Sequence, residues 1–127
     1  ILGLYDDDED SIRKNVDFLR KHQFEWNNIY PAFAYPGTPF YDKYVGEGII
    51  EEPRSWEEYG LYSYECKPLP TKHLTSAQVL SLRDELFNEY YGDQNVQDNL
   101  RIKFGQKTID HINEMLSVKL KRKILGD

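Results

Sequence analysis

The chain opens on a short apolar run, Ile1-Leu2-Gly3-Leu4, that passes directly into an acidic segment, Asp6–Asp10. Such a run is typical of a buried strand that ends in a loop. A buried strand needs hydrogen-bonded partners on both sides, and this one starts in mid-element. We therefore expect the chain to be a piece of a longer protein, with much of the chemistry in the residues upstream.

A second apolar segment, Trp26–Tyr35, is predicted to be another strand buried on both faces, because its apolar and polar residues do not alternate. Pro31 makes part of it irregular. Between the two segments, Asp8 is placed to cap a helix that runs to about His22. The apolar stripe of this helix consists of Ile12, Val16 and Leu19. The order predicts two parallel strands joined by a crossing helix.

The remainder of the chain is predicted to be mostly helical. Thr38-Pro39 suits the start of a short helix, and residues 49–74 read as irregular, with one helical turn at Ser55–Tyr59. Thr75-Ser76-Ala77-Gln78 is a capping box that opens a long helix. Two more helices follow, over residues 94–104 and along the apolar positions Ile109, Ile112, Leu116 and Leu120. The predicted fold class is α/β and helix-rich.

Composition limits the class of function. The net charge of -6 argues against a general nucleic-acid binder, which is usually basic. Cys66 is the single cysteine, so the chain alone can form neither a disulfide nor a cysteine-only metal or iron–sulfur site. No apolar run reaches the roughly 18–20 residues that span a bilayer, and no segment has the pattern of a signal peptide. We expect a cytoplasmic protein without a membrane span.

The two apolar segments resemble a recurrent part of radical S-adenosylmethionine (SAM) enzymes. In that family a strand ends in Gly-Leu-Pro-Gly-Glu-Thr before an acidic, apolar-striped helix, and Gly3-Leu4 followed by Asp8–Ile12 is similar. The next strand often ends in Tyr-Pro-Gly-Thr, as Tyr35-Pro36-Gly37-Thr38 does here. The later order of Ser55-Trp56 and Leu74-Thr75 also fits, so the resemblance covers roughly residues 1–90. It looks like the subgroup with an upstream cobalamin-binding domain, which includes cyclases and methyltransferases.

The resemblance implies the C-terminal part of such an enzyme. Residues 1–66 would be the last β/α units of a partial, TIM-like (β/α) barrel, and residues 67–127 a helical C-terminal extension. The implied cofactors of the parent protein are SAM and a [4Fe-4S] cluster, with cobalamin left open. The ends of the two strands would help to line the SAM and substrate cleft, and the backbone after Phe33 and Ala34 would lie near the adenine. The implied cofactor-binding positions are Gly3, Asp7, Ala34, Tyr35 and Pro36.

Three departures from the family pattern bear on this expectation. The cluster motif CxxxCxxC is absent, and so is a cobalamin-binding histidine motif. Tyr5-Asp6-Asp7 stands where the family has Pro-Gly-Glu, which puts a tight SAM contact there in doubt. We therefore expect no catalytic residue and no metal ligand in this chain, and expect the upstream part of the same polypeptide to be its partner. The parent would be an enzyme, while this segment alone would catalyse nothing.

Plain structural roles are favoured for several other residues. Asp6, Asp8 and Asp10 alternate as in a calcium loop, but the glycine and glutamate of an EF-hand are missing, which favours a capped helix start. The histidines lack ligand spacing, and Cys66 has no paired base. The basic residues Lys119–Lys123 are predicted to be a solvated helix end. The aromatic residues Phe33, Tyr35, Phe40, Tyr41 and Tyr44 could form a core or stack a flat ligand.

A second class of function is kept beside the first. The chain could be a stand-alone helical interaction module whose docking surface is the aromatic stretch of residues 24–64. A CxxxCxxC motif upstream of Ile1 in the full gene is the feature that separates the two hypotheses.

Overall fold

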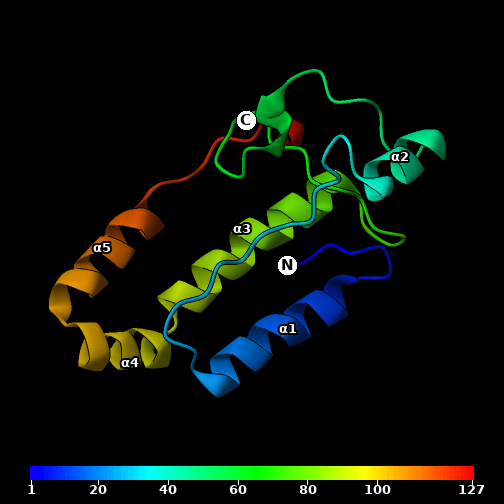
Figure 1. Ribbon diagram of the computed structural model, residues 1–127. Helices are drawn as coiled ribbons and strands as arrows, with labels where there is room; N and C mark the ends of the chain where they lie inside the picture. The colour runs from blue at the N-terminus through cyan, green and yellow to red at the C-terminus, as the bar shows by residue number, and fades with distance from the viewer.

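The computed structural model describes all 127 residues as a set of helices joined by extended segments (Figure 1). In chain order the elements are α1 (Glu9–His22), α2 (Pro39–Gly46), the 3₁₀ turn η1 (Trp56–Tyr59), α3 (Ser76–Gly92), α4 (Gln94–Phe104), α5 (Gln106–Ser117) and the 3₁₀ turn η2 (Lys123–Leu125). The long helix α3 lies at the centre with α1 beside it, and α4 and α5 follow at its C-terminal end. None of these helices has the length and apolar character needed to cross a membrane.

The helix starts lie where the sequence predicts them, because each is fixed by a local cap. At α1 the Asp8 carboxylate accepts a hydrogen bond from the Ser11 amide at 2.8 Å, and the Ser11 hydroxyl accepts one from the Asp8 amide at 3.1 Å. Thr75 and Gln78 form the predicted capping box at α3. The predictions of α1, α2, η1, α3 and α4 are confirmed.

The predicted pair of parallel strands is wrong, and with it the α/β fold class and the TIM-like barrel fragment. The chain contains no sheet, and the two apolar segments meet in one isolated parallel bridge, Leu2 with Pro31. The Leu2 amide donates to the Tyr30 carbonyl at 2.9 Å, and the Leu2 carbonyl accepts from the Ala32 amide at 2.8 Å. The ladder stops there because Gly3 leaves the extended conformation at a φ of 78°.

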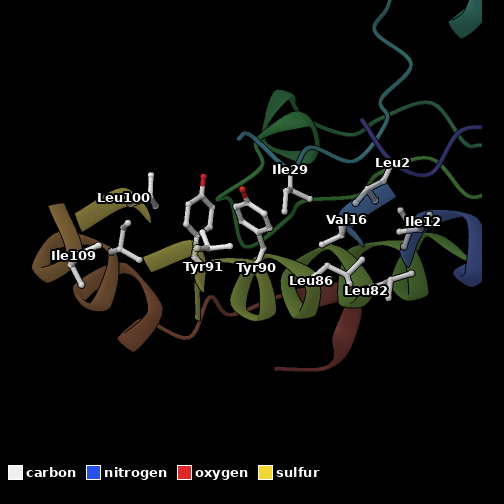
Figure 2. Packing of buried hydrophobic residues seen from close by; sticks show 13 residues of the cluster. Leu2, Ile12, Val16, Ile29, Leu82, Leu86, Tyr90, Tyr91, Leu100 and Ile109 are labelled. Carbon is white, nitrogen blue, oxygen red and sulfur yellow. The ribbon is translucent and has the colours of Figure 1, made fainter. Parts of the chain in front are cut away.

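The core is a cluster of 13 buried residues along α3 (Figure 2). At one end of the cluster Leu82 and Leu86 lie near residues from α1 and the first extended segment, while Tyr91 lies toward α4 and α5. The cluster draws Leu2 and Ile12 from residues 1–66, and Val79, Leu100 and Ile112 from residues 67–127. The two units predicted from the sequence therefore share one core.

The last helix ends earlier than predicted. α5 stops at Ser117, so Leu120 and the basic residues Lys119–Lys123 lie beyond it, and the prediction of a helix end there is wrong. Lys119, Lys121 and Lys123 are exposed as predicted. Arg122 is fully buried. Its Nε and Nη2 donate to Asp84 of α3 at 2.9 and 3.0 Å, and its Nη1 donates to the Leu61 carbonyl at 2.6 Å. These bonds draw the C-terminal segment back against α3.

Candidate functional site

The candidate site lies where the two apolar segments run side by side. Because the Leu2–Pro31 bridge is parallel, the turns that follow the two segments leave the pair at the same end. Gly3 adopts a positive φ that side chains rarely adopt, and a Cβ at this position would lie 2.8 Å from Cγ1 of Val79 on α3. The first turn is therefore packed directly against the start of α3.

Asp7 holds this first turn in place. One carboxylate oxygen, Oδ2, accepts from the amides of Gly3 and Leu4 at 3.0 and 2.9 Å. The other, Oδ1, accepts from the Ser11 hydroxyl at 2.9 Å. Both oxygens are thus engaged within the chain, which gives Asp7 the geometry of a positioning residue. A direct contact between Asp7 and a cofactor stays a prediction.

The second turn is equally well defined. The Tyr35 carbonyl accepts from the Thr38 amide at 3.2 Å and from the Thr38 hydroxyl at 2.7 Å, and Gly37 has a φ of 85°. Thr38 then caps α2 through the Tyr41 amide at 3.2 Å. Just before the turn, the amides and carbonyls of Phe33 and Ala34 have no backbone partner, although Ala34 is buried. Buried backbone groups in folded proteins are nearly always paired, so the unpaired groups of the buried Ala34 are unusual.

An uncharged groove of about 440 Å³ opens beside the two segments. We call it the aromatic groove. Ten residues line it, and none has a charged side chain: Ile1, Leu4, Tyr30, Pro31, Ala32, Phe33, Tyr35, Phe40, Tyr59 and Leu61. Several of them are well exposed, Ile1 at 82% and Tyr35 at 50%. A groove of this kind suits the apolar or flat part of a partner.

Two stacked tyrosines form one wall of the aromatic groove. The rings of Tyr35 and Tyr59 lie 5.0 Å apart at an interplanar angle of 25°, and Phe33 meets Tyr59 edge-on at 6.1 Å. Tyr59 comes from η1, which Ser55 caps. Burial raises the pKa of the Tyr59 hydroxyl above its ordinary value. Such a wall offers a stacking surface to a planar ring.

The aromatic cluster predicted from the sequence is divided between this groove and a core. Phe33, Tyr35 and Phe40 line the aromatic groove. Tyr44 is buried instead in a small cluster with Ala32, Ala34 and Leu69, against which Tyr41 packs. The Tyr44 hydroxyl has no hydrogen-bond partner, and burial raises its pKa.

Of the five predicted cofactor-binding positions, Tyr35 alone lines the aromatic groove. Gly3 and Asp7 form the first turn, Ala34 is buried with its backbone unpaired, and Pro36 belongs to the second turn. Ile1 and Leu4 also line the groove but were not predicted as site residues. Tyr30, Tyr59 and Leu61 were predicted only as part of the alternative docking surface of residues 24–64. The Ser55 cap predicts the turn that carries Tyr59, but no sequence signal indicates that this turn packs beside Tyr35.

The other residues that could take part in chemistry or metal binding lie in surroundings that indicate structural roles. Cys66 is 1% exposed, and burial raises the pKa of its thiol to about 11, which keeps it in the unreactive protonated form at neutral pH. No group of three or more His, Cys, Asp or Glu side chains is arranged to hold a metal ion. Asp8 caps α1, as the preferred interpretation of the acidic segment predicts.

The fold and site define a helix-rich chain in which two parallel extended segments border an uncharged, aromatic-walled groove. No protein-family model, curated protein or solved structure matches the chain. The function is therefore argued from the site itself.

Proposed function

We propose that this chain is the C-terminal part of a radical SAM enzyme, where it completes the cleft for SAM and substrate. The single observation that supports the proposal most is the parallel bridge between Leu2 and Pro31. The two motifs that resemble the family, Gly3-Leu4 and Tyr35-Pro36-Gly37-Thr38, are far apart in sequence. They nevertheless follow segments that run parallel and border one groove.

The residues fit SAM better than they fit the other two implied groups. Adenine carries hydrogen-bond donors and acceptors on its edges, which can pair with the backbone of Phe33, a residue that lines the aromatic groove and whose amide and carbonyl have no backbone partner. The neutral Tyr35–Tyr59 wall offers its face a stacking surface. In the parent enzyme, SAM would supply the carbon radical that abstracts hydrogen from the substrate. The chain carries a single cysteine and no cobalamin-binding histidine motif, so it does not fit a [4Fe-4S] cluster or cobalamin.

The first test uses the full-length protein, purified without oxygen and supplied with iron, sulfide and a reductant. The expected result is a CxxxCxxC motif upstream of Ile1 and reductive cleavage of SAM to 5′-deoxyadenosine, measured by chromatography. Tyr35→Ala should weaken SAM binding roughly tenfold, because it removes a stacking ring. Tyr62→Ala is the matched control, since Tyr62 is 65% exposed and does not line the aromatic groove.

Two results would overturn the proposal. A full gene without the cysteine motif removes the enzyme hypothesis altogether. If the Tyr35→Ala and Tyr62→Ala proteins both cleave SAM and bind it with equal affinity, the enzyme hypothesis stays intact. That result would show that this segment does not contribute to the cleft.

The exposed aromatic side chains favour a second candidate function, a helical protein-interaction module. Trp56 is 73% exposed and lies 5.7 Å from Tyr59, at the margin of the aromatic groove. Aromatic residues of this kind are enriched at the centre of protein interfaces. This candidate is favoured if the full gene lacks the cysteine motif, and it predicts that Trp56→Ala abolishes partner binding while leaving the fold unchanged.

A further inference from the structure

The aromatic groove is bordered by two segments that no hydrogen bond joins directly. We call residues 29–35 the first wall and residues 55–65 the second wall. No hydrogen bond within the chain links one wall to the other, and they meet through aromatic rings, as in the stack of Tyr35 on Tyr59. The spacing of the two backbones therefore depends on what each wall is bonded to elsewhere.

The first wall is bonded to α3 through Arg83. The Ile29 carbonyl accepts from Nε of Arg83 at 2.8 Å, and the Arg83 side chain is only 3% exposed. The guanidinium carbon of Arg83 lies 4.8 Å from the centre of the Phe87 ring, one helical turn further along α3. This contact holds the plane of the guanidinium group, so the direction of its bond to the first wall is well defined.

The second wall is bonded to the C-terminal segment through Arg122. Nη1 of Arg122 donates to the Leu61 carbonyl at 2.6 Å and to the Ser63 carbonyl at 3.2 Å. Leu61 itself lines the aromatic groove. In Figure 1 the C-terminal end of the chain accordingly lies close to η1. Arg122 thus plays the same part for the second wall as Arg83 plays for the first.

Asp84 joins these two arginines. Its carboxylate accepts from Nη1 of Arg83 at 2.8 Å, and from Nε and Nη2 of Arg122 at 2.9 and 3.0 Å. Two buried guanidinium groups repel each other, and a carboxylate bonded to both offsets that repulsion. Asp84 lies within the long helix α3, and a side chain on a helix is positioned more precisely than one on a loop.

From this arrangement we infer that Asp84 is a positioning residue for the aromatic groove. By holding Arg83 and Arg122 together, Asp84 fixes the spacing of the two walls and with it the overlap of the Tyr35 and Tyr59 rings. Asp84 does not line the aromatic groove, so it acts on a bound ligand only through the two arginines. The inference about the shape of the groove holds for either candidate function, and its consequence for SAM rests on the proposed function.

The test measures the contact between the Tyr35 and Tyr59 rings in the chain without ligand. Rings stacked at 5.0 Å should give a nuclear Overhauser signal between their protons, which is followed in protein labelled with ¹³C-tyrosine. Asp84→Asn keeps the shape of the side chain but removes its charge and turns one acceptor into a donor. The variant should therefore lose the ring contact while the amide spectrum of α3 stays that of a folded helix.

Arg122→Lys is the second variant, and it decides the question if Asp84→Asn fails to fold. Lysine keeps the positive charge but lacks the guanidinium fork, so one ammonium group cannot hold both Asp84 and the Leu61 carbonyl in the same geometry. This variant should also lose the contact between the tyrosine rings.

Ile109→Ala is the control for a general loss of stability. Ile109 is 1% exposed and lies in the core at the end away from Leu2, as Figure 2 shows. Its truncation leaves a cavity without touching either wall or the arginines. At a temperature where every variant is fully folded, Ile109→Ala should keep the contact between the Tyr35 and Tyr59 rings.

The consequence for a ligand is measured with SAM and the full-length protein. Asp84→Asn should weaken SAM binding several-fold, whereas Ile109→Ala should leave the affinity unchanged. A native protein that binds no SAM would contradict the proposed function, while the ring contact would still decide the inference about Asp84.

The inference is overturned if the ring contact persists in both the Asp84→Asn and Arg122→Lys proteins. It is also overturned if Ile109→Ala loses the contact to the same extent, because the effect would then come from general loosening of the fold.

Discussion

Gly3 is the residue at which backbone conformation and packing constrain the sequence most tightly. Its φ of 78° disfavours any side chain, and an added Cβ would lie 2.8 Å from Val79. Gly3→Ala should therefore destabilise the fold by about 1–3 kcal/mol, measured by urea denaturation. Gly46→Ala is the matched control, because nothing lies within 4 Å of its added Cβ and its φ is not positive. Equal stability of the two variants would contradict the packing of the first turn on α3.

Cys66 offers a second test at the same scale. Burial raises the pKa of its thiol from 9.0 to about 11, since the thiolate is disfavoured away from water. A raised folded pKa means that the stability contributed by the protonated thiol is complete below pH 9 and is lost as the pH rises toward 11. Alkylation by iodoacetamide should accordingly be slow at pH 8 and accelerate through this window, as followed by mass spectrometry.

The unfolded chain is the control for that experiment. In urea, Cys66 should react as an ordinary thiol, with a midpoint near its unshifted pKa of 9.0. A native protein that is alkylated at pH 8 as fast as the unfolded one would show that Cys66 is not buried.

At the scale of elements, the C-terminal segment depends on one side chain. Arg122 donates to Asp84, to Leu61 and, at 3.2 Å, to the Ser63 carbonyl, and its neighbour Lys123 donates its amide to the Tyr64 carbonyl at 3.0 Å. Arg122→Met should leave the Leu61 and Ser63 carbonyls without this donor and leave Asp84 with Arg83 as its remaining cation. Removing one partner of a buried ion pair costs about 3–5 kcal/mol.

Hydrogen exchange locates that loss. In the Arg122→Met protein the Lys123 amide should lose its protection from hydrogen exchange. Amides in the middle of α1 should lose protection only to the extent that the whole protein becomes less stable. The control is Lys121→Met, because Lys121 is exposed and forms no ion pair. Unchanged protection of Lys123 in the Arg122→Met protein would contradict the role of Arg122 as the anchor of this segment.

Elements differ in how much of their structure the sequence predicts. α1, α2 and α3 were predictable because Asp8, Thr38 and Thr75 cap them with groups only three residues away. The strand prediction failed because a strand is defined by its partners, and after Leu2 the amides of Gly3 and Leu4 bond to Asp7 instead of a neighbouring segment. The path of residues 118–127 depends on Asp84, which is 38 residues away from Arg122 and leaves no periodic signal.

In the candidate site, too, local turns were predictable from the sequence and contacts between distant residues were not. The two turns around Gly3 and Gly37 carry recognisable residues, and Tyr35 was predicted to lie in the site. The stacking of Tyr35 on Tyr59 was not predictable, because it depends on how an irregular segment folds back. The buried backbone of Ala34 is likewise visible only once its surroundings are known.

At the scale of the whole molecule, the shared core predicts cooperative unfolding. Leu2, Ile12 and Ile29 from the N-terminal half pack in the same cluster as Leu86 and Ile112 from the C-terminal half. Neither half can lose its structure without exposing apolar surface of the other. Single domains built in this way usually unfold in one step.

The measurement follows urea unfolding with two probes, fluorescence of Trp26 and the NMR signals of α5. Trp26 lies 5.6 Å from Tyr91 of α3, whereas α5 belongs to the C-terminal half. The two curves should coincide, and Leu86→Ala should shift both equally, by about 2–5 kcal/mol, because Leu86 is 1% exposed within the shared cluster. Two separate transitions, with Leu86→Ala shifting only the second, would show that residues 67–127 fold as a unit of their own. A single transition would mean that residues 1–66, which line the aromatic groove, are held in place by their packing against α3.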